Sequence, residues 1–171
     1  MRPVDALLDE YGESHRHRLN KLIHWVCVPA IMFSVLGLLW SLSVPDVLAR
    51  APFLNWAVLC VVLAMVYYLL VSVRLALGIL VVAALMLAVL SWLARTGLSI
   101  WLTSAAIFAL AWAVQFIGHH VEGRRPSFLK DVQFLLIGPL WLLAHLYRKL
   151  GIRYCSVSPD LPARGDARPP N

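Results

Sequence analysis

The stretch FLNWAVLCVVLAMVYYLLVSVRLALGILVVAALMLAVLSWLA at residues 53–94 decides the fold class, because Arg74 is its only charged side chain. An apolar segment of about 20 residues is long enough to cross the roughly 30 Å hydrocarbon core of a bilayer as a helix. The stretch therefore predicts two membrane-spanning helices, Pro52 to Val73 and Leu75 to Ala94, joined by a very tight turn at Arg74.

Further apolar runs flank this pair of predicted spans. Leu22 to Val44 precedes it and Leu98 to Gly118 follows it, each long enough to cross. Phe134 to Tyr147 is shorter and is interrupted by Gly138-Pro139, which favours a re-entrant or interfacial segment broken at that pair. We therefore expect an all-α integral membrane protein, a bundle of four transmembrane helices plus this C-terminal segment.

Composition separates a membrane domain from a polar tail. Only 14% of the residues are charged, whereas soluble domains carry about 25%. Residues 1–153 contain every apolar run, and we expect them to form a single membrane-embedded helical domain. Residues 154–171 are rich in proline and poor in apolar side chains, which predicts a disordered C-terminal tail.

The distribution of basic residues predicts an orientation in the membrane. With four spans, all of the 15 Lys and Arg residues except Arg50 and Arg95 fall on the side of the two termini. A crossing fifth segment would make the split nearly even, so the positive-inside rule favours both termini in the cytoplasm. The short loops fit a bacterial inner membrane, or the endoplasmic reticulum in a eukaryote. The basic residues flank spans rather than form an aromatic-interleaved patch, so we expect no nucleic-acid partner.

Histidines gather near the ends of the apolar runs together with one carboxylate: His15, His17, His24, His119, His120, His145 and Glu122. In the predicted topology all of them lie at the cytoplasmic face. A lone interfacial histidine often only hydrogen-bonds a lipid phosphate, but a cluster of ionisable side chains at one membrane depth indicates a functional site. Imidazole and carboxylate are ligands of iron and zinc. The sequence therefore predicts a metal site, and it leaves iron versus zinc open.

Helical spacing restricts which side chains of the first span can meet. Asn20 and His24 are four residues apart and share a helix face, and His17 joins them if the helix begins that early. His15 is nine residues before His24 and points the opposite way on a continuous helix. It joins His24 only if the chain bends between them.

The end of the fourth predicted span presents a similar face. His119 and Glu122 are three residues apart and point the same way, whereas His120 points about 100° aside. Gln115 lies one turn before His119 on the same face, where an amide can orient a metal-binding imidazole.

Other chemistries find little support in the sequence. The cysteines Cys27, Cys60 and Cys155 form no CxxC pair, so neither a disulfide framework nor a thiolate metal site is indicated. The HxxxH and HxxHH boxes of di-iron desaturases are absent. Transport is disfavoured, because no charged side chain lies deep in a span beside an evident partner.

Two motifs resemble the signatures of a known family. YGESHRHRLNKLIHWVCVP at residues 11–29 has a His-x4-Asn-x3-His core followed by Pro, and QFIGHHVEGRRPSFLKD at residues 115–131 has Gln-Phe-Ile-Gly-His-x-x-Glu followed by basic residues and Pro. Both are similar to motifs of the DUF962, or Mpo1-like, membrane proteins, in the same order. The resemblance covers roughly Tyr11 to Gly151.

The resemblance implies an activity and a set of site residues. That family is similar to an Fe(II)-dependent 2-hydroxy fatty acid dioxygenase of the α-oxidation route, so it implies the cofactor Fe(II) and the partners O2, a 2-hydroxy fatty acid and membrane lipids. The implied iron ligands are His15, His24 and His119. The implied catalytic and orienting residues are Glu122, Asn20 and Gln115.

Several roles stay open at this point. His145 is a further candidate ligand. Family members often have Asn and Pro where this chain has His17 and Arg18, and this departure makes His17 a rival of His15. Arg124 and Arg125 are either positive-inside anchors or a clamp for the substrate carboxylate. The sequence leaves homo-oligomerisation open.

The predicted reaction needs no external reductant. Conversion of a 2-hydroxy acid to the acid one carbon shorter and CO2 removes four electrons, which one O2 accepts. Our hypothesis is that the 2-hydroxycarboxylate chelates Fe(II) at the cytoplasmic membrane face. The alternative is a non-catalytic membrane protein that binds haem or lipid.

Overall fold

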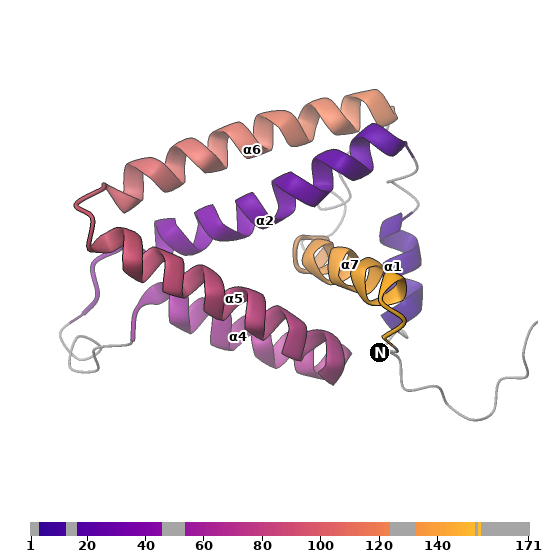
Figure 1. Ribbon diagram of the computed structural model, residues 1–171, viewed down its shortest axis with the longest axis horizontal. Helices are drawn as coiled ribbons and strands as arrows, with labels where there is room; N and C mark the ends of the chain where they lie inside the picture. The colour runs from indigo at the N-terminus through magenta and orange to yellow at the C-terminus, as the bar shows by residue number, and fades with distance from the viewer. Residues whose placement is uncertain (1–3, 13–16, 46–53, 124–132, 153, 155–171) are drawn as a thin grey trace, which may run out of the picture.

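The computed structural model describes residues 4–12, 17–45, 54–123, 133–152 and 154 (Figure 1). The regular structure in these ranges is helical, without any strand, which confirms the expected all-α class. The helices are α1 (Val4–Gly12), α2 (Arg18–Trp40), α4 (Trp56–Val71), α5 (Val73–Ala94), α6 (Ile100–Glu122) and α7 (Gln133–Lys149).

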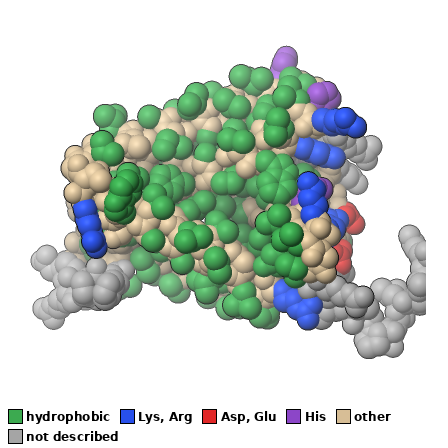
Figure 2. Space-filling view, in the orientation of Figure 1, with side chains coloured by type: hydrophobic (Ala, Val, Ile, Leu, Met, Phe, Trp, Pro, Cys, Tyr) green, Lys and Arg blue, Asp and Glu red, His purple; other side chains and the backbone are tan. Residues whose placement is uncertain are grey.

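Three of the helices are long and apolar enough to cross a membrane. These are α2 with 23 residues, α5 with 22 and α6 with 23. α4 has 16 residues and is too short for the same criterion, so four spans are not confirmed within the described ranges. It begins only at Trp56, because the side chain of Asn55 accepts a hydrogen bond from the Val58 backbone N–H and caps the helix. Large apolar side chains cover much of the surface, as expected for a membrane protein (Figure 2).

The predicted tight turn is present, but it lies at Ser72, two residues before Arg74, which belongs to α5. α4 ends at Val71 and α5 begins at Val73, so Ser72 alone separates the two helices. Ser72 has extended backbone geometry, and its hydroxyl donates to the Tyr154 carbonyl. Tyr154 is buried, whereas residues 155–171, most of the predicted tail, lie outside the described ranges.

α2 and α6 form an antiparallel pair that packs closely at both ends. A Cβ atom built on Gly118 of α6 would lie 2.6 Å from Asn20 Oδ1, and one built on Gly37 of α2 would lie against Ser104 Oγ. Small residues that let helix backbones approach are the usual means of association in membranes. Glycine is therefore required at both positions for this separation of the helices.

The α2/α6 pair and the α4/α5 pair diverge towards one end, where α7 and α1 lie (Figure 1). α7 packs on α1, α2 and α5. These helices share a hydrophobic core. α1 contributes Val4, Leu7, Leu8 and Tyr11 to it, and α7 contributes Ile137, Leu140, Trp141 and Ala144. The same end carries most of the basic and histidine side chains visible in Figure 2. The start of α2 and the end of α6 therefore share one end of the bundle, as the topology prediction requires.

The predicted break at Gly138-Pro139 is wrong, because α7 is continuous from Gln133 to Lys149 with Pro139 inside it. Proline removes one helical hydrogen bond, and in membrane proteins neighbouring groups compensate for the loss. The carbonyl that loses its helical donor at Pro139 is that of Leu135, and at the next residue the Tyr68 hydroxyl donates to the Leu136 carbonyl. Gly138 is close to the Tyr11 hydroxyl, so packing on both sides holds the helix together.

Candidate functional site

Buried polar side chains mark one end of the α2/α6 pair. Among the described residues, the buried polar side chains are Asn20, His24, Ser34, Ser104, Gln115 and His119. Asn20 and His24 come from the first two turns of α2, and Gln115 and His119 come from the last two turns of α6. Antiparallel packing thus brings together the two motifs that the sequence analysis singled out.

His24 is fully buried and both of its ring nitrogens are engaged. Nδ1 lies 3.0 Å from the Asn20 carbonyl oxygen, and Nε2 lies 2.8 Å from Gln115 Nε2. A carbonyl oxygen only accepts, so Nδ1 carries the proton and Nε2 accepts from the Gln115 amide. A neutral imidazole whose Nδ1–H is held by a carbonyl is the form in which histidine binds a metal through Nε2.

His119 lies directly against His24. The two ring centroids are 5.1 Å apart at an interplanar angle of 88°, and His119 is only 4% exposed. Gln115, one turn earlier on α6, is also buried. Its Oε1 accepts no hydrogen bond from any part of the chain that the structure describes. Because a buried polar atom normally has a partner, this oxygen points to a ligand at the site.

Asn20 and Glu122 connect the beginning of α2 to the end of α6. Glu122 Oε2 accepts hydrogen bonds from the His17 backbone N–H at 2.8 Å and from Asn20 Nδ2 at 3.2 Å. A carboxylate at a helix N-terminus is also favoured by the helix dipole. In this arrangement Glu122 fixes the position of α2, and through it the position of His24.

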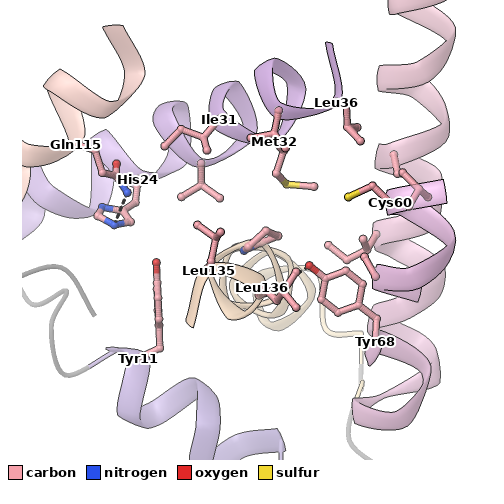
Figure 3. A pocket seen from close by; sticks show the side chains of 18 of the residues that line it. Tyr11, His24, Ile31, Met32, Leu36, Cys60, Tyr68, Gln115, Leu135 and Leu136 are labelled. Atoms are coloured by element: carbon pink, nitrogen blue, oxygen red, sulfur yellow. Dashed lines mark hydrogen bonds between the residues drawn. The ribbon is translucent and has the colours of Figure 1, made fainter. Parts of the chain in front are cut away.

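Tyr11 is a site residue that the sequence analysis did not assign. Its side chain extends from α1 towards His24 (Figure 3), with the ring centroids 6.5 Å apart. Burial raises the pKa of Tyr11, so its hydroxyl stays protonated at neutral pH. The sequence held a signal for this residue, because Tyr11 continues the apolar stripe of Val4, Leu7 and Leu8 at helical spacing.

Three other histidines lie apart from the His24–His119 pair. His17 is the exposed N-cap of α2, and its Nδ1 accepts from the Leu19 backbone N–H. α2 therefore begins too late for His17 to share the helix face of His24. His120 is exposed. His145 packs against Trp25 and Trp141.

The pKa of His145 is below its usual range. Burial is the main cause, followed by the cations of Lys149, Arg148 and Lys21. His15, Arg124 and Arg125, which the sequence analysis also assigned to the site, lie outside the described ranges.

The donor set fits part of a metal site. No group of three or more His, Cys, Asp or Glu side chains in the described ranges is arranged to hold a metal ion. The structure instead offers two adjacent buried imidazoles, with the Gln115 oxygen beside them. Nitrogen and oxygen donors of this kind suit iron or zinc, and a complete site needs at least one further ligand.

An apolar cavity of about 230 Å³ begins at this polar cluster and lies between the two helix pairs. His24, Gln115, His119 and Tyr11 line one end of it. Figure 3 shows Cys60 and Leu36 at a distance from His24, with Ile31 and Met32 between them. Almost all of the remaining lining is aliphatic or aromatic.

Comparisons with known proteins identify the family of this chain. Residues 1–150 match the family described as 2-hydroxy-palmitic acid dioxygenase Mpo1-like. The chain is 30% identical over 143 residues to the 2-hydroxy-palmitic acid dioxygenase MPO1 of Saccharomyces cerevisiae, covering 82% of this chain and 78% of the yeast protein. No solved structure matches. The chain belongs to the Mpo1-like family.

Proposed function

We propose that this membrane protein is a non-haem iron dioxygenase that shortens 2-hydroxy long-chain fatty acids by one carbon at the cytoplasmic membrane face. The observation that carries the proposal is the pair of buried imidazoles, His24 and His119, at the polar end of an apolar cavity. Membership of the Mpo1-like family and the printed activity of the yeast relative support it.

His24 and His119 would hold the ferrous ion. His15, which stands between α1 and α2 in the sequence, would be the third imidazole. Bound iron would supply the activation of O2 and the Lewis acidity that the reaction needs. Gln115 occupies the Nε2 side of His24 at 2.8 Å, so its amide would have to turn aside as the metal binds.

The chain's own residues orient these ligands. The Asn20 carbonyl keeps His24 in the Nδ1–H form, and Glu122 anchors the first turn of α2 through Asn20 and the His17 amide. Tyr11, neutral and buried, is placed to donate a hydrogen bond to a bound substrate. We assign Arg124 and Arg125 to the substrate carboxylate on charge alone.

The overall reaction balances with O2 as the only oxidant. A 2-hydroxy acid, R–CH(OH)–COOH, and O2 give R–COOH, CO2 and H2O. The C1–C2 bond breaks, and the four electrons lost by the substrate reduce both oxygen atoms of O2. No separate reductase or 2-oxoacid cosubstrate is required.

The geometry argues against the haem alternative. The two axial histidines of one haem face each other across the macrocycle. His24 and His119 meet edge to face at 5.1 Å, which leaves no room for a porphyrin between them. A lipid-binding protein without catalysis is the remaining alternative, because the apolar cavity alone would suit it.

A product assay tests the proposal. The protein would be purified in detergent without O2, loaded with Fe(II) and incubated with 2-hydroxyhexadecanoate and O2. We expect pentadecanoate and CO2 in equal amounts, with one O2 consumed per turnover and no product from hexadecanoate. Absence of pentadecanoate from iron-loaded protein would contradict the proposal and leave the lipid-binding alternative.

A further inference from the structure

The cavity follows one face of α2 for most of its length. His24, Val28, Ile31, Met32, Val35 and Leu36 line it at helical spacing, and α4, α5 and α7 form its other walls. His24 and Leu36 are twelve residues apart, which is about 18 Å along a helix. The cavity is therefore elongated, with its polar end at His24.

The lining determines what class of molecule can fill this space. At about 230 Å³ the cavity far exceeds the roughly 10–15 Å³ that one water molecule needs. Apolar cavities do not hold water well, because water finds no hydrogen-bond partners in them. A large empty cavity is also unfavourable in a packed protein. Its occupant should therefore be an apolar chain.

The length of the cavity fits a long acyl chain. An extended alkyl chain with C–C bonds of about 1.5 Å and staggered torsions advances about 1.25 Å per carbon. The roughly 18 Å between His24 and Leu36 thus corresponds to about 14 carbons. At the polar end, His24, Gln115, His119 and Tyr11 provide the only cluster of polar groups on the described wall. A fatty acid bound with its oxygens at this cluster and its alkyl chain along the apolar wall matches both ends of the cavity.

We propose that this cavity is the acyl-chain site for the 2-hydroxy fatty acid, and that the wall around Cys60 and Ala83 sets the longest chain it accepts. The inference rests on the proposed function, because the head group is assigned to the His24–His119 end. Cys60 and Ala83 lie at the same level of the α4/α5 hairpin, being twelve and eleven residues from the turn at Ser72, and both line the cavity. The wall thus limits the length of the bound chain, and we call this limit the ruler.

Protection of Cys60 from alkylation tests the proposal without requiring turnover. Full-length protein in detergent, under argon, would react with N-ethylmaleimide, and peptide mass spectrometry would follow each cysteine. At a ligand concentration about tenfold above its Kd, 2-hydroxyhexadecanoate or hexadecanoate should slow alkylation of Cys60 roughly tenfold. 2-Hydroxybutanoate, too short to reach Cys60, should leave the rate unchanged. Cys27 is buried between α2 and α6, does not line the cavity and serves as the internal control.

A matched pair of variants tests the ruler. Ala83 is buried and lines the cavity, whereas its neighbour Ala84 is exposed. Ala83→Phe should shift the binding preference to shorter chains, since each methylene that no longer fits weakens binding roughly fourfold. Ala84→Phe should keep the wild-type preference.

The outcomes separate this inference from the proposed function. Protection of Cys60 by long chains without any turnover would keep the acyl-chain site and overturn the enzymatic assignment. Turnover without protection of Cys60, or equal protection of Cys27, would overturn the acyl-chain site. An unchanged chain preference in folded Ala83→Phe would overturn the ruler. If that variant does not fold, a series of chain lengths on the wild-type protein decides, because a length limit requires binding to weaken once the chain is longer than the one that first protects Cys60.

Discussion

Both ends of the α2/α6 pair are closely packed at a glycine, but their buried polar groups differ. Gly118 meets Asn20 at one end, and Gly37 meets Ser104 at the other, and both contacts exclude a larger residue than glycine. At the second end the buried Ser34 hydroxyl donates to the Ile31 carbonyl of its own helix. At the first end His24 likewise bonds a carbonyl of its own helix, that of Asn20, but it also bonds Gln115 of α6, whose oxygen has no hydrogen-bond partner within the described ranges.

This difference teaches how to recognise the site. Burial of polar side chains occurs at both ends, so burial alone indicates packing rather than function. What distinguishes the first end is a cross-helix hydrogen bond from Gln115 to His24 beside two imidazoles in contact, while the Asn20 carbonyl of the same helix fixes the tautomer of His24. Such fixed orientation is what a metal ligand requires.

The largest expected effect comes from removing either imidazole of the pair. His24→Ala and His119→Ala should each lower pentadecanoate formation by more than the roughly 10–100-fold typical of residues that only orient a ligand. His120→Ala is the matched control, because His120 adjoins His119 in sequence and is exposed. It should stay within about twofold of wild type, as surface changes usually do. Equal losses in His119→Ala and His120→Ala would contradict the assignment.

Gln115 offers the next largest effect. Gln115→Leu keeps a side chain of similar volume but removes the buried amide beside the two imidazoles, so activity should fall roughly 10–100-fold while the fold is retained. Ser104→Ala changes a buried polar group at the opposite end and should leave activity near wild type. The kcat and KM of the two variants, measured beside their thermal unfolding, distinguish orientation of the site from packing. A Gln115→Leu enzyme with unchanged kcat and KM would show that the amide orients nothing.

The glycine contacts give the comparison its sharpest structural test. Gly118→Ala and Gly37→Ala should each destabilise the protein by roughly 1–3 kcal/mol, because both overpack the same helix pair. Only Gly118→Ala should also reduce the activity of the folded fraction, since it displaces Asn20 and the start of α2. Ser104→Ala should recover part of the stability lost in Gly37→Ala. Loss of activity per folded molecule in Gly37→Ala would contradict this difference between the two ends.

The smallest expected effect concerns His145 and pH. Burial and nearby cations lower the pKa of His145 in the folded protein below the unfolded value of about 6.5. The neutral form is therefore favoured on folding, and its contribution is complete above about pH 6.5 and declines as the pH falls below it. His145→Phe, which retains a ring beside Trp25 and Trp141, should remove a small part of the acid destabilisation. A thermal melt series from pH 5 to 8 measures it, and an identical pH dependence in both proteins would contradict the shift.

Much of the fold could be predicted from the lengths of the apolar runs in the sequence. The tight turn before Arg74 and the long helices α2, α5 and α6 were predictable, because an uncharged run of this length has few alternatives. The nine-residue α1 was not, since its apolar stripe is too short for any span criterion. α7 is continuous through Pro139 where it packs on α1, α2 and α5, and local sequence does not reveal these contacts.

The site was predictable where helical spacing decides it. Spacing alone placed Asn20 with His24 and Gln115 with His119, and antiparallel packing then brought the two sets together. Spacing did not reveal that Glu122 binds the α2 N-terminus, or that Tyr11 reaches the site from a separate helix. Both are contacts between different helices, which no periodicity within one helix encodes.

The most direct test of the central claim is iron binding at the α2/α6 end. Wild type, His24→Ala, His119→Ala and His120→Ala would be loaded with Fe(II) without O2, desalted and measured for bound iron and for the electron paramagnetic resonance signal of the nitric oxide adduct. We predict about one iron per wild-type and His120→Ala chain, and loss of iron and signal in His24→Ala and His119→Ala. Full iron and an unchanged signal in either of the last two variants would contradict the account.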